Sequence, residues 1–115
     1  MREQFDNILA SPARLLVLAA LIPGRPLRFM ELRSMTGLAD GNLHVQTRKL
    51  EAAGILTIHK SAKGRRTLTS FQITEAGVAR FRRFVRRLQT VLDQESGGIS
   101  ASLGEDRADD SQVWS

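Results

Sequence analysis

The feature that most constrains the fold is a change of hydrophobic period at Gly54. Before this glycine, residues 41–53 place Leu43 and Leu50 on one face of a predicted helix. After it, residues 55–59 alternate apolar and polar side chains and are rich in β-branched residues, which is typical of a strand. The sequence therefore predicts a helix that ends at Gly54 and a strand that follows it.

Periodic patterns on both sides of this junction predict the remaining elements. Ser11 and Pro12 have the form of an N-cap and a first helical residue, which leaves open a short leading turn that breaks near Ser11. The predicted elements are helices at residues 5–22, 28–35 and 41–53, strands at 55–59 and 67–73 joined by a turn at 60–66, and a last helix at 75–93.

Two residues punctuate the connection between the second and third predicted helices. Gly37 supplies the left-handed conformation that ends the second helix, and Asp40 is the predicted N-cap of the third. A helix pair joined by a glycine turn and followed by a hairpin is a winged helix-turn-helix arrangement. The predicted fold is therefore mainly α with a β-hairpin wing, in the order α-α-α-β-β-α, and a short strand after the first helix is compatible with it.

Charge divides the 115-residue chain into two parts. Residues 1–94 contain 16 Lys and Arg against 7 Asp and Glu, a formal charge of +9. Residues 95–115 contain one Arg and five acids, a charge of −4, and are poor in apolar residues. We predict a domain at 1–94 and an acidic, disordered tail at 95–115. A basic domain suggests a polyanionic partner, although a merely soluble basic surface would give the same charge.

Motifs between residues 8 and 88 resemble the MarR-like winged-helix regulators. The strongest block is residues 38–56, LADGNLHVQTRKLEAAGIL, and the similarity continues through Lys60, residues 64–66, Thr69, residues 73–77 and Phe81. The resemblance implies a DNA-binding transcriptional regulator that acts as a homodimeric repressor. Its recognition helix would begin near Gly41.

The chain departs from this family pattern at Thr47, where a large apolar residue is usual. The smaller, polar side chain predicts either looser packing of the helix or a hydrogen bond from its hydroxyl to the backbone of the preceding turn.

The outward face of the helix at 41–53 carries the candidate base-reading side chains. The amides of Asn42 and Gln46 suit bidentate contacts with adenine, and Val45 suits a thymine methyl group. His44 can meet a base or a phosphate, while Arg48 and Lys49 lie further along, where phosphate contact or simple solvation is expected. Each of these residues is equally consistent, taken alone, with an ordinary solvated helix surface.

The predicted hairpin turn is the second candidate site. It places four cations within seven residues, namely Lys60, Lys63, Arg65 and Arg66. Beside a recognition helix we expect such a wing to contact flanking DNA backbone or a narrow minor groove, rather than to be only a solvated loop.

The last predicted helix carries more apolar residues than one small domain needs. In the related regulators the terminal helices form a dimer, so we predict a homodimer interface, with intramolecular packing as the alternative. The candidate interface residues are Phe5, Ile8, Leu9, Phe84, Leu88, Val91 and Leu92.

Several function classes lack support in the sequence. There is no cysteine, there are only two histidines, and we find no catalytic or metal-ligating constellation, so neither enzymatic activity nor a cofactor or metal is expected. We find no signal peptide and no apolar run long enough for a membrane span, which predicts a cytoplasmic protein.

Two alternatives remain open. The winged helix could serve as a protein-interaction module, and tail acids Asp106, Asp109 and Asp110 could compete with DNA for the wing. Neither the operator nor any small-molecule effector follows from the sequence.

Overall fold

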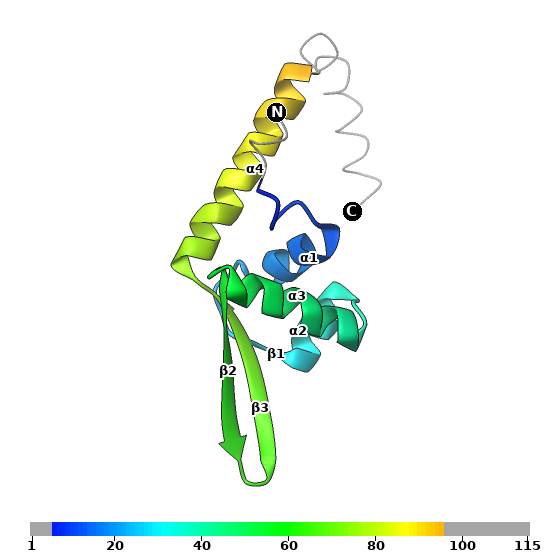
Figure 1. Ribbon diagram of the computed structural model, residues 1–115, viewed down its shortest axis with the longest axis vertical. Coiled ribbons are helices and arrows are strands. Elements are labelled where there is room, and N and C mark those ends of the chain that lie inside the picture. Colours follow the sequence, from blue (N-terminus) through cyan, green and yellow to red (C-terminus); the bar gives the residue numbers. More distant parts are fainter. Residues whose placement is uncertain (1–5, 96–115) are drawn as a thin grey trace. The chain divides into compact units, whose positions relative to one another are not determined.

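The computed structural model describes residues 6–95. Its elements are α1 (Pro12–Leu21), β1 (Leu27–Arg28), α2 (Phe29–Thr36), α3 (Asp40–Ala52), β2 (Leu56–Lys63), β3 (Arg66–Ile73) and α4 (Glu75–Glu95), as Figure 1 shows. The strands form an antiparallel sheet in the order β1-β3-β2. This arrangement confirms the predicted winged helix-turn-helix, including the short strand after the first helix.

The chain divides into two units, with the boundary inside α4 between Phe84 and Val85. Apart from the backbone of Glu95, the predicted acidic tail at residues 95–115 lies outside the described residues, and so does Phe5. Among residues 6–95, no helix combines the length and the apolar character that crossing a membrane requires.

The first helix begins later than the apolar pattern alone indicates. A short turn, closed by a hydrogen bond of 2.9 Å from the Ala10 N–H to the Asp6 carbonyl, precedes it. The Ser11 hydroxyl then accepts a hydrogen bond from the Arg14 N–H, and Pro12 is the first helical residue. The break near Ser11 that the sequence left open is therefore present, because the cap favours an extended conformation at that residue.

The turn between α2 and α3 differs from the prediction at its second half. Gly37 has φ of 72° and ends α2, as predicted. The N-cap of α3 is Ala39 rather than Asp40, so the predicted cap was wrong by one residue. Asp40 occupies the first turn instead, where its carboxylate pairs with Arg33 at 2.8 Å and lies favourably at the positive end of the helix dipole.

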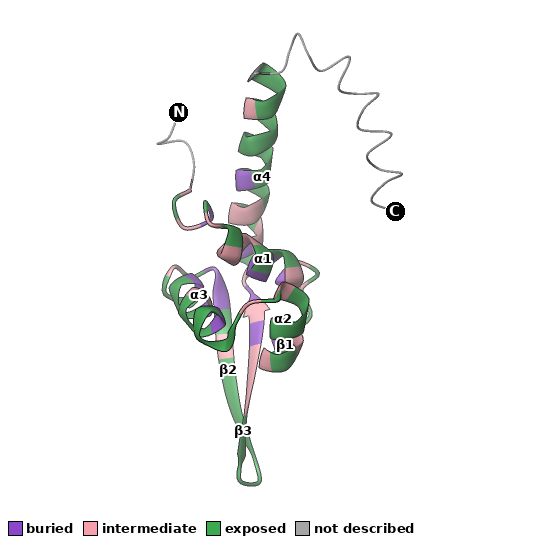
Figure 2. Ribbon diagram, turned by 90° about the vertical axis from the view of Figure 1, so that its right-hand side faces the viewer, coloured by how far each residue is buried: buried purple, intermediate pink, exposed green. Residues whose placement is uncertain are grey.

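Leucine side chains from α1, α2 and α3 form the core together with the inner ends of β2 and β3 (Figure 2). Leu43 and Leu50 of α3 are fully buried, and so is Thr47 between them. The Thr47 hydroxyl donates a hydrogen bond of 2.9 Å to the Leu43 carbonyl. Of the two predicted outcomes for Thr47, the backbone hydrogen bond is the one observed, and it makes burial of the hydroxyl acceptable.

The hairpin is longer than predicted. Its register pairs Leu56 with Ile73 and continues to Lys63 opposite Arg66, so the turn contains only Gly64 and Arg65. Gly64 has φ of 66°, as a two-residue hairpin turn with glycine at its first position requires. The prediction of a turn at 60–66 was wrong because polar composition was taken to indicate a loop. A β-hairpin in solvent can carry polar side chains, because its two strands satisfy each other's backbone hydrogen bonds.

Three elements meet where β3 enters α4. The Thr74 hydroxyl accepts a hydrogen bond from the Gly77 N–H at 2.9 Å, and the Thr74 N–H donates to the Ile55 carbonyl, also at 2.9 Å. Gly77 lies so close to Ile55 that a Cβ added there would be 2.2 Å from the Ile55 carbonyl oxygen. The capping of α4 by Thr74 agrees with the predicted start of the last helix, and the contact explains why residue 77 must be glycine.

We expect Gly77→Ala to lower the free energy of unfolding by about 1–3 kcal/mol, the usual cost of overpacking a filled site. The reason is that the new methyl group meets backbone atoms, which cannot move aside as a flexible side chain can. Urea-induced unfolding followed by circular dichroism measures the change.

The matched control is Gly41→Ala. Gly41 lies on α3 with no atom within 4 Å of the added Cβ, so this variant should be as stable as the wild type or up to about 1 kcal/mol more stable. Equal stability of Gly77→Ala and the wild type would contradict the close contact.

Candidate nucleic-acid interface

Helix α3 presents a polar face opposite its buried leucines. Asn42, His44, Val45, Arg48 and Lys49 are all exposed, and Val45 retains 48% of its surface. The N-terminal half of such a helix can enter a major groove and bring short side chains to base edges. The structure thus places these five predicted site residues, but not Gln46, on one accessible face.

His44 is more constrained than a solvated surface residue. Its ring stacks on Phe29 of α2, with the centroids 4.6 Å apart and the planes inclined by 25°. The stacking limits the orientations of the imidazole while leaving the residue exposed. No sequence spacing connects residues 29 and 44, so the pattern gave no indication of this contact.

Gln46 is partly buried and both ends of its amide are engaged. Its Oε1 accepts a hydrogen bond of 2.8 Å from Nη1 of Arg14, and its Nε2 donates one of 2.8 Å to Oδ1 of Asn42. The predicted bidentate contact of Gln46 with adenine would require both hydrogen bonds to break. Arg14 lies on α1 and was not among the predicted site residues, because only the tertiary packing of α1 on α3 brings it close.

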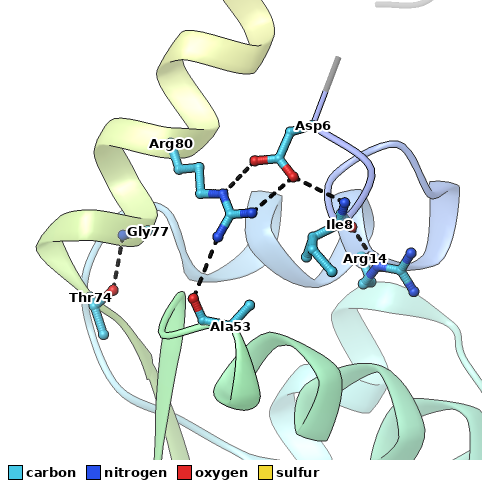
Figure 3. Close-up of polar contacts among 7 residues, drawn as sticks. All are labelled: Asp6, Ile8, Arg14, Ala53, Thr74, Gly77 and Arg80. Carbon is cyan, nitrogen blue, oxygen red and sulfur yellow. Dashed lines mark hydrogen bonds and ion pairs between the residues drawn. The ribbon is translucent and has the colours of Figure 1, made fainter. Parts of the chain in front are cut away.

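A second polar cluster anchors the turn that precedes α1 (Figure 3). The Asp6 carboxylate accepts hydrogen bonds from two nitrogens of Arg80, one of them at 3.0 Å, and from the Ile8 N–H at 3.0 Å. Arg80 also donates to the Ala53 carbonyl at 3.4 Å. Arg80 therefore stabilises the first unit by joining α4 to the turn before α1 and to the end of α3.

The electrostatics of Asp6 follow from these contacts. Burial raises the pKa of the carboxyl group, but the hydrogen bonds from Arg80 and from the Ile8 N–H outweigh this, so the pKa of Asp6 lies below its ordinary value. The folded state therefore favours the ionised carboxylate.

The structure distributes the four predicted wing cations over both faces of the hairpin. Lys63 and Arg66 are directly opposite each other in the register and share one face, whereas Lys60 lies on the other face and Arg65 is in the turn. All four are exposed. Like charges directly across a ribbon repel each other, so this pair does not stabilise the hairpin.

A shallow groove connects the two candidate sites. It is lined by Arg48 and Glu51 of α3 and by Ile58 and Lys60 of β2. The recognition helix and the base of the wing therefore contribute to one continuous surface, with Arg48 and Lys60 on its two sides.

The predicted interface residues occupy different environments. Leu9 and Phe84 are buried in the core of this chain, and Ile8 is partly buried against that core. In the second unit, Leu88 and Leu92 are 41% and 53% exposed and Val91 is partly buried. Within residues 6–95, no group of three or more His, Asp or Glu side chains is arranged to hold a metal ion.

Residues 13–92 match the protein family described as "Winged helix DNA-binding domain". The chain belongs to this family. It is thus a winged helix DNA-binding transcriptional regulator, as the resemblance in the sequence implied. No curated protein matches the chain in sequence.

Solved structures of transcriptional regulators share this winged helix fold. A transcriptional regulator homologue from Pyrococcus horikoshii OT3 is 31% identical, with 77% of this chain and 88% of that chain covered and a TM-score of 0.71. BpsR of Bordetella bronchiseptica, whose DNA binding is regulated by 6-hydroxynicotinic acid, is 17% identical, with 85% and 74% covered and a TM-score of 0.65. A MarR-family regulator from Porphyromonas gingivalis W83 is 18% identical, with 80% and 83% covered and a TM-score of 0.56. The MarR-like character of this winged helix is confirmed at the level of the fold.

We expect Asp6→Asn to lower the free energy of unfolding at pH 7 by about 1–3 kcal/mol, because it removes a charge-assisted hydrogen-bond partner of Arg80. The wild type should lose this contribution as the pH falls below the ordinary carboxyl range, near about pH 4, since the folded-state pKa is the lower one. The variant should therefore show a smaller loss of stability between pH 5 and pH 2 in urea unfolding.

Glu51→Gln is the control, since it removes an exposed carboxylate from α3. We expect it to change stability at pH 7 by less than about 0.5 kcal/mol. Parallel stability–pH curves for Asp6→Asn and the wild type would contradict the role assigned to Asp6.

Proposed function

We propose that this winged helix protein is a homodimeric, cytoplasmic repressor that binds a pseudo-palindromic site in duplex DNA. In this proposal α3 enters the major groove and the wing contacts the flanking backbone or minor groove. The observation that carries it is the continuous surface formed by the polar face of α3 and the cationic hairpin. No enzymatic step is part of the proposal.

The charges support this binding mode. Arg48 and Lys60 line one groove together with the single acid Glu51, and Lys63, Arg65 and Arg66 add positive charge up to the tip of the hairpin. Phosphate contacts from such residues fix the orientation of a protein on DNA, while base contacts from the N-terminal half of α3 supply specificity. Repression is the role that the resemblance to the MarR-like regulators implies.

Exposed apolar side chains in the second unit support a dimer. Val85 and Leu88 retain 46% and 41% of their surface, at the three-residue spacing of one helix face. In the proposed dimer the two α3 helices occupy successive major grooves, about 10 base pairs apart.

Fluorescence anisotropy with duplex DNA tests the DNA contact of the wing. We expect log affinity to fall linearly with log salt concentration, with a slope of roughly 0.9 per neutralised phosphate. Arg65→Ala combined with Arg66→Ala should weaken binding to all sequences and reduce the slope by about 2, because two phosphate contacts are lost.

Arg82→Ala combined with Arg83→Ala is the matched control, since it removes the same charge from two adjacent exposed positions of α4 outside the proposed surface. Binding to duplex DNA weaker than about 10 µM at low salt, or independent of salt, would contradict the proposal. If the protein keeps its regulatory function after both wing arginines are lost, the wing is not needed for that function. This result would favour a protein-interaction module.

Sedimentation analysis of Leu88→Asp tests the dimer. The buried charge should shift the chain to a monomer and weaken binding to a two-half-site duplex at least tenfold, because a charge buried without a partner is strongly unfavourable. Gln89→Asp adds the same charge to the neighbouring exposed position and should remain dimeric. A wild type that is monomeric at micromolar concentration would refute this part of the proposal.

A further inference from the structure

The hydrogen bonds between Arg14, Gln46 and Asn42 fix the orientation of two side-chain amides. A guanidinium group can only donate, so the Gln46 atom 2.8 Å from Arg14 must be its oxygen. The nitrogen of that amide then faces Asn42 and must meet an acceptor, so the Asn42 atom 2.8 Å away is also an oxygen. Arg14, whose guanidinium has no acceptor, therefore sets the donor-to-acceptor direction of both hydrogen bonds.

Arg14 is itself held in place from the other side. Its Nε donates to the Ile8 carbonyl, and its backbone N–H donates to the Ser11 hydroxyl at 3.3 Å. Figure 3 shows the same turn bound through the Ile8 N–H to Asp6, which pairs with Arg80. The guanidinium is therefore positioned before any ligand arrives, and it is partly buried rather than free to follow a phosphate.

We propose that Arg14 is a positioning residue that sets the base preference of the recognition helix. Acting through Gln46, it turns the oxygen of Asn42 along the helix and leaves the NH₂ group of Asn42 as the end presented to DNA. Asn42 is exposed and lies in the first turns of α3, where base contacts are made. The inference rests on the proposed major-groove binding of α3.

The chemistry of the base edges converts this orientation into a preference. Guanine presents two acceptors in the major groove, N7 and O6, and both suit an NH₂ donor. Adenine presents one acceptor and one donor, so a bidentate contact needs the amide oxygen as well as the nitrogen. With its oxygen engaged by Gln46, Asn42 should prefer guanine to adenine, whereas a freely rotating asparagine should prefer adenine.

Selection of bound sequences from a random duplex pool, with the full chain, tests the proposal. Asn42→Ala identifies the base pair that Asn42 reads, as the position at which selectivity is lost. At that position the wild type should prefer guanine over adenine on the order of fivefold, the effect of about one hydrogen bond. Arg14→Met should abolish or reverse this preference, and Arg14→Lys, which keeps a donor without an acceptor, should restore part of it.

Two further variants separate positioning from other roles. Gln46→Glu keeps an acceptor for Arg14 but cannot donate to Asn42, so it should lose the guanine preference even if Arg14→Met folds poorly. Arg25→Met removes an exposed arginine outside this network and should leave the preference intact. If Arg14 instead contacted phosphate, its loss would weaken binding to all sequences alike and leave the base preference unchanged, which would overturn the proposal.

A measurement without DNA distinguishes failure of the positioning role of Arg14 from failure of the proposed function. In ¹⁵N NMR spectra, Arg14→Met should accelerate exchange of the Gln46 side-chain amide protons with solvent. Unchanged exchange would refute the positioning role of Arg14. A protected Gln46 amide with adenine selected at the Asn42 position refutes only the base preference, and a protein that selects no duplex sequence refutes the proposed function on which that preference rests.

Discussion

The Ile55 carbonyl is the point on which the arrangement of the domain depends. It accepts the Thr74 N–H at 2.9 Å and lies against Gly77, while the N–H of the same residue bonds to the Leu50 carbonyl at 3.0 Å. One residue thus joins the end of α3, the base of the wing and the start of α4. Because this junction has no space for a side chain at residue 77, the end of α3, the end of β3 and the start of α4 are held close together at Ile55.

A second set of contacts controls the exposed face of α3 rather than its position. Phe29 stacks on His44, and Arg14 fixes the amide of Gln46. Both partners come from other helices, so the candidate reading side chains are oriented by contacts from α1 and α2. Such preorganisation reduces the entropy lost when a side chain is immobilised on a ligand.

Much of the fold could be predicted because its signals are local. The Ser11 cap, the left-handed Gly37 and the change of period at Gly54 each act within a few residues, and all three elements are present as predicted. The errors occurred where a local signal was ambiguous. Asp40 is a good N-cap residue that is also favoured in a first turn, and the polar residues 60–63 belong to a strand because β3 pairs with them.

The sequence by itself determined the winged helix order, the outward face of α3 and the presence of four cations in the wing, since helical and strand periods assign each side chain to a face. Only the tertiary structure decided that Arg14 and Asn42 belong to one network, that Arg80 pairs with Asp6, and that Leu9 and Phe84 lie in the core. Residues 6 and 80 are 74 positions apart, and no period relates them. Their contact exists because the packing of buried apolar surface, which is non-directional, brings them together.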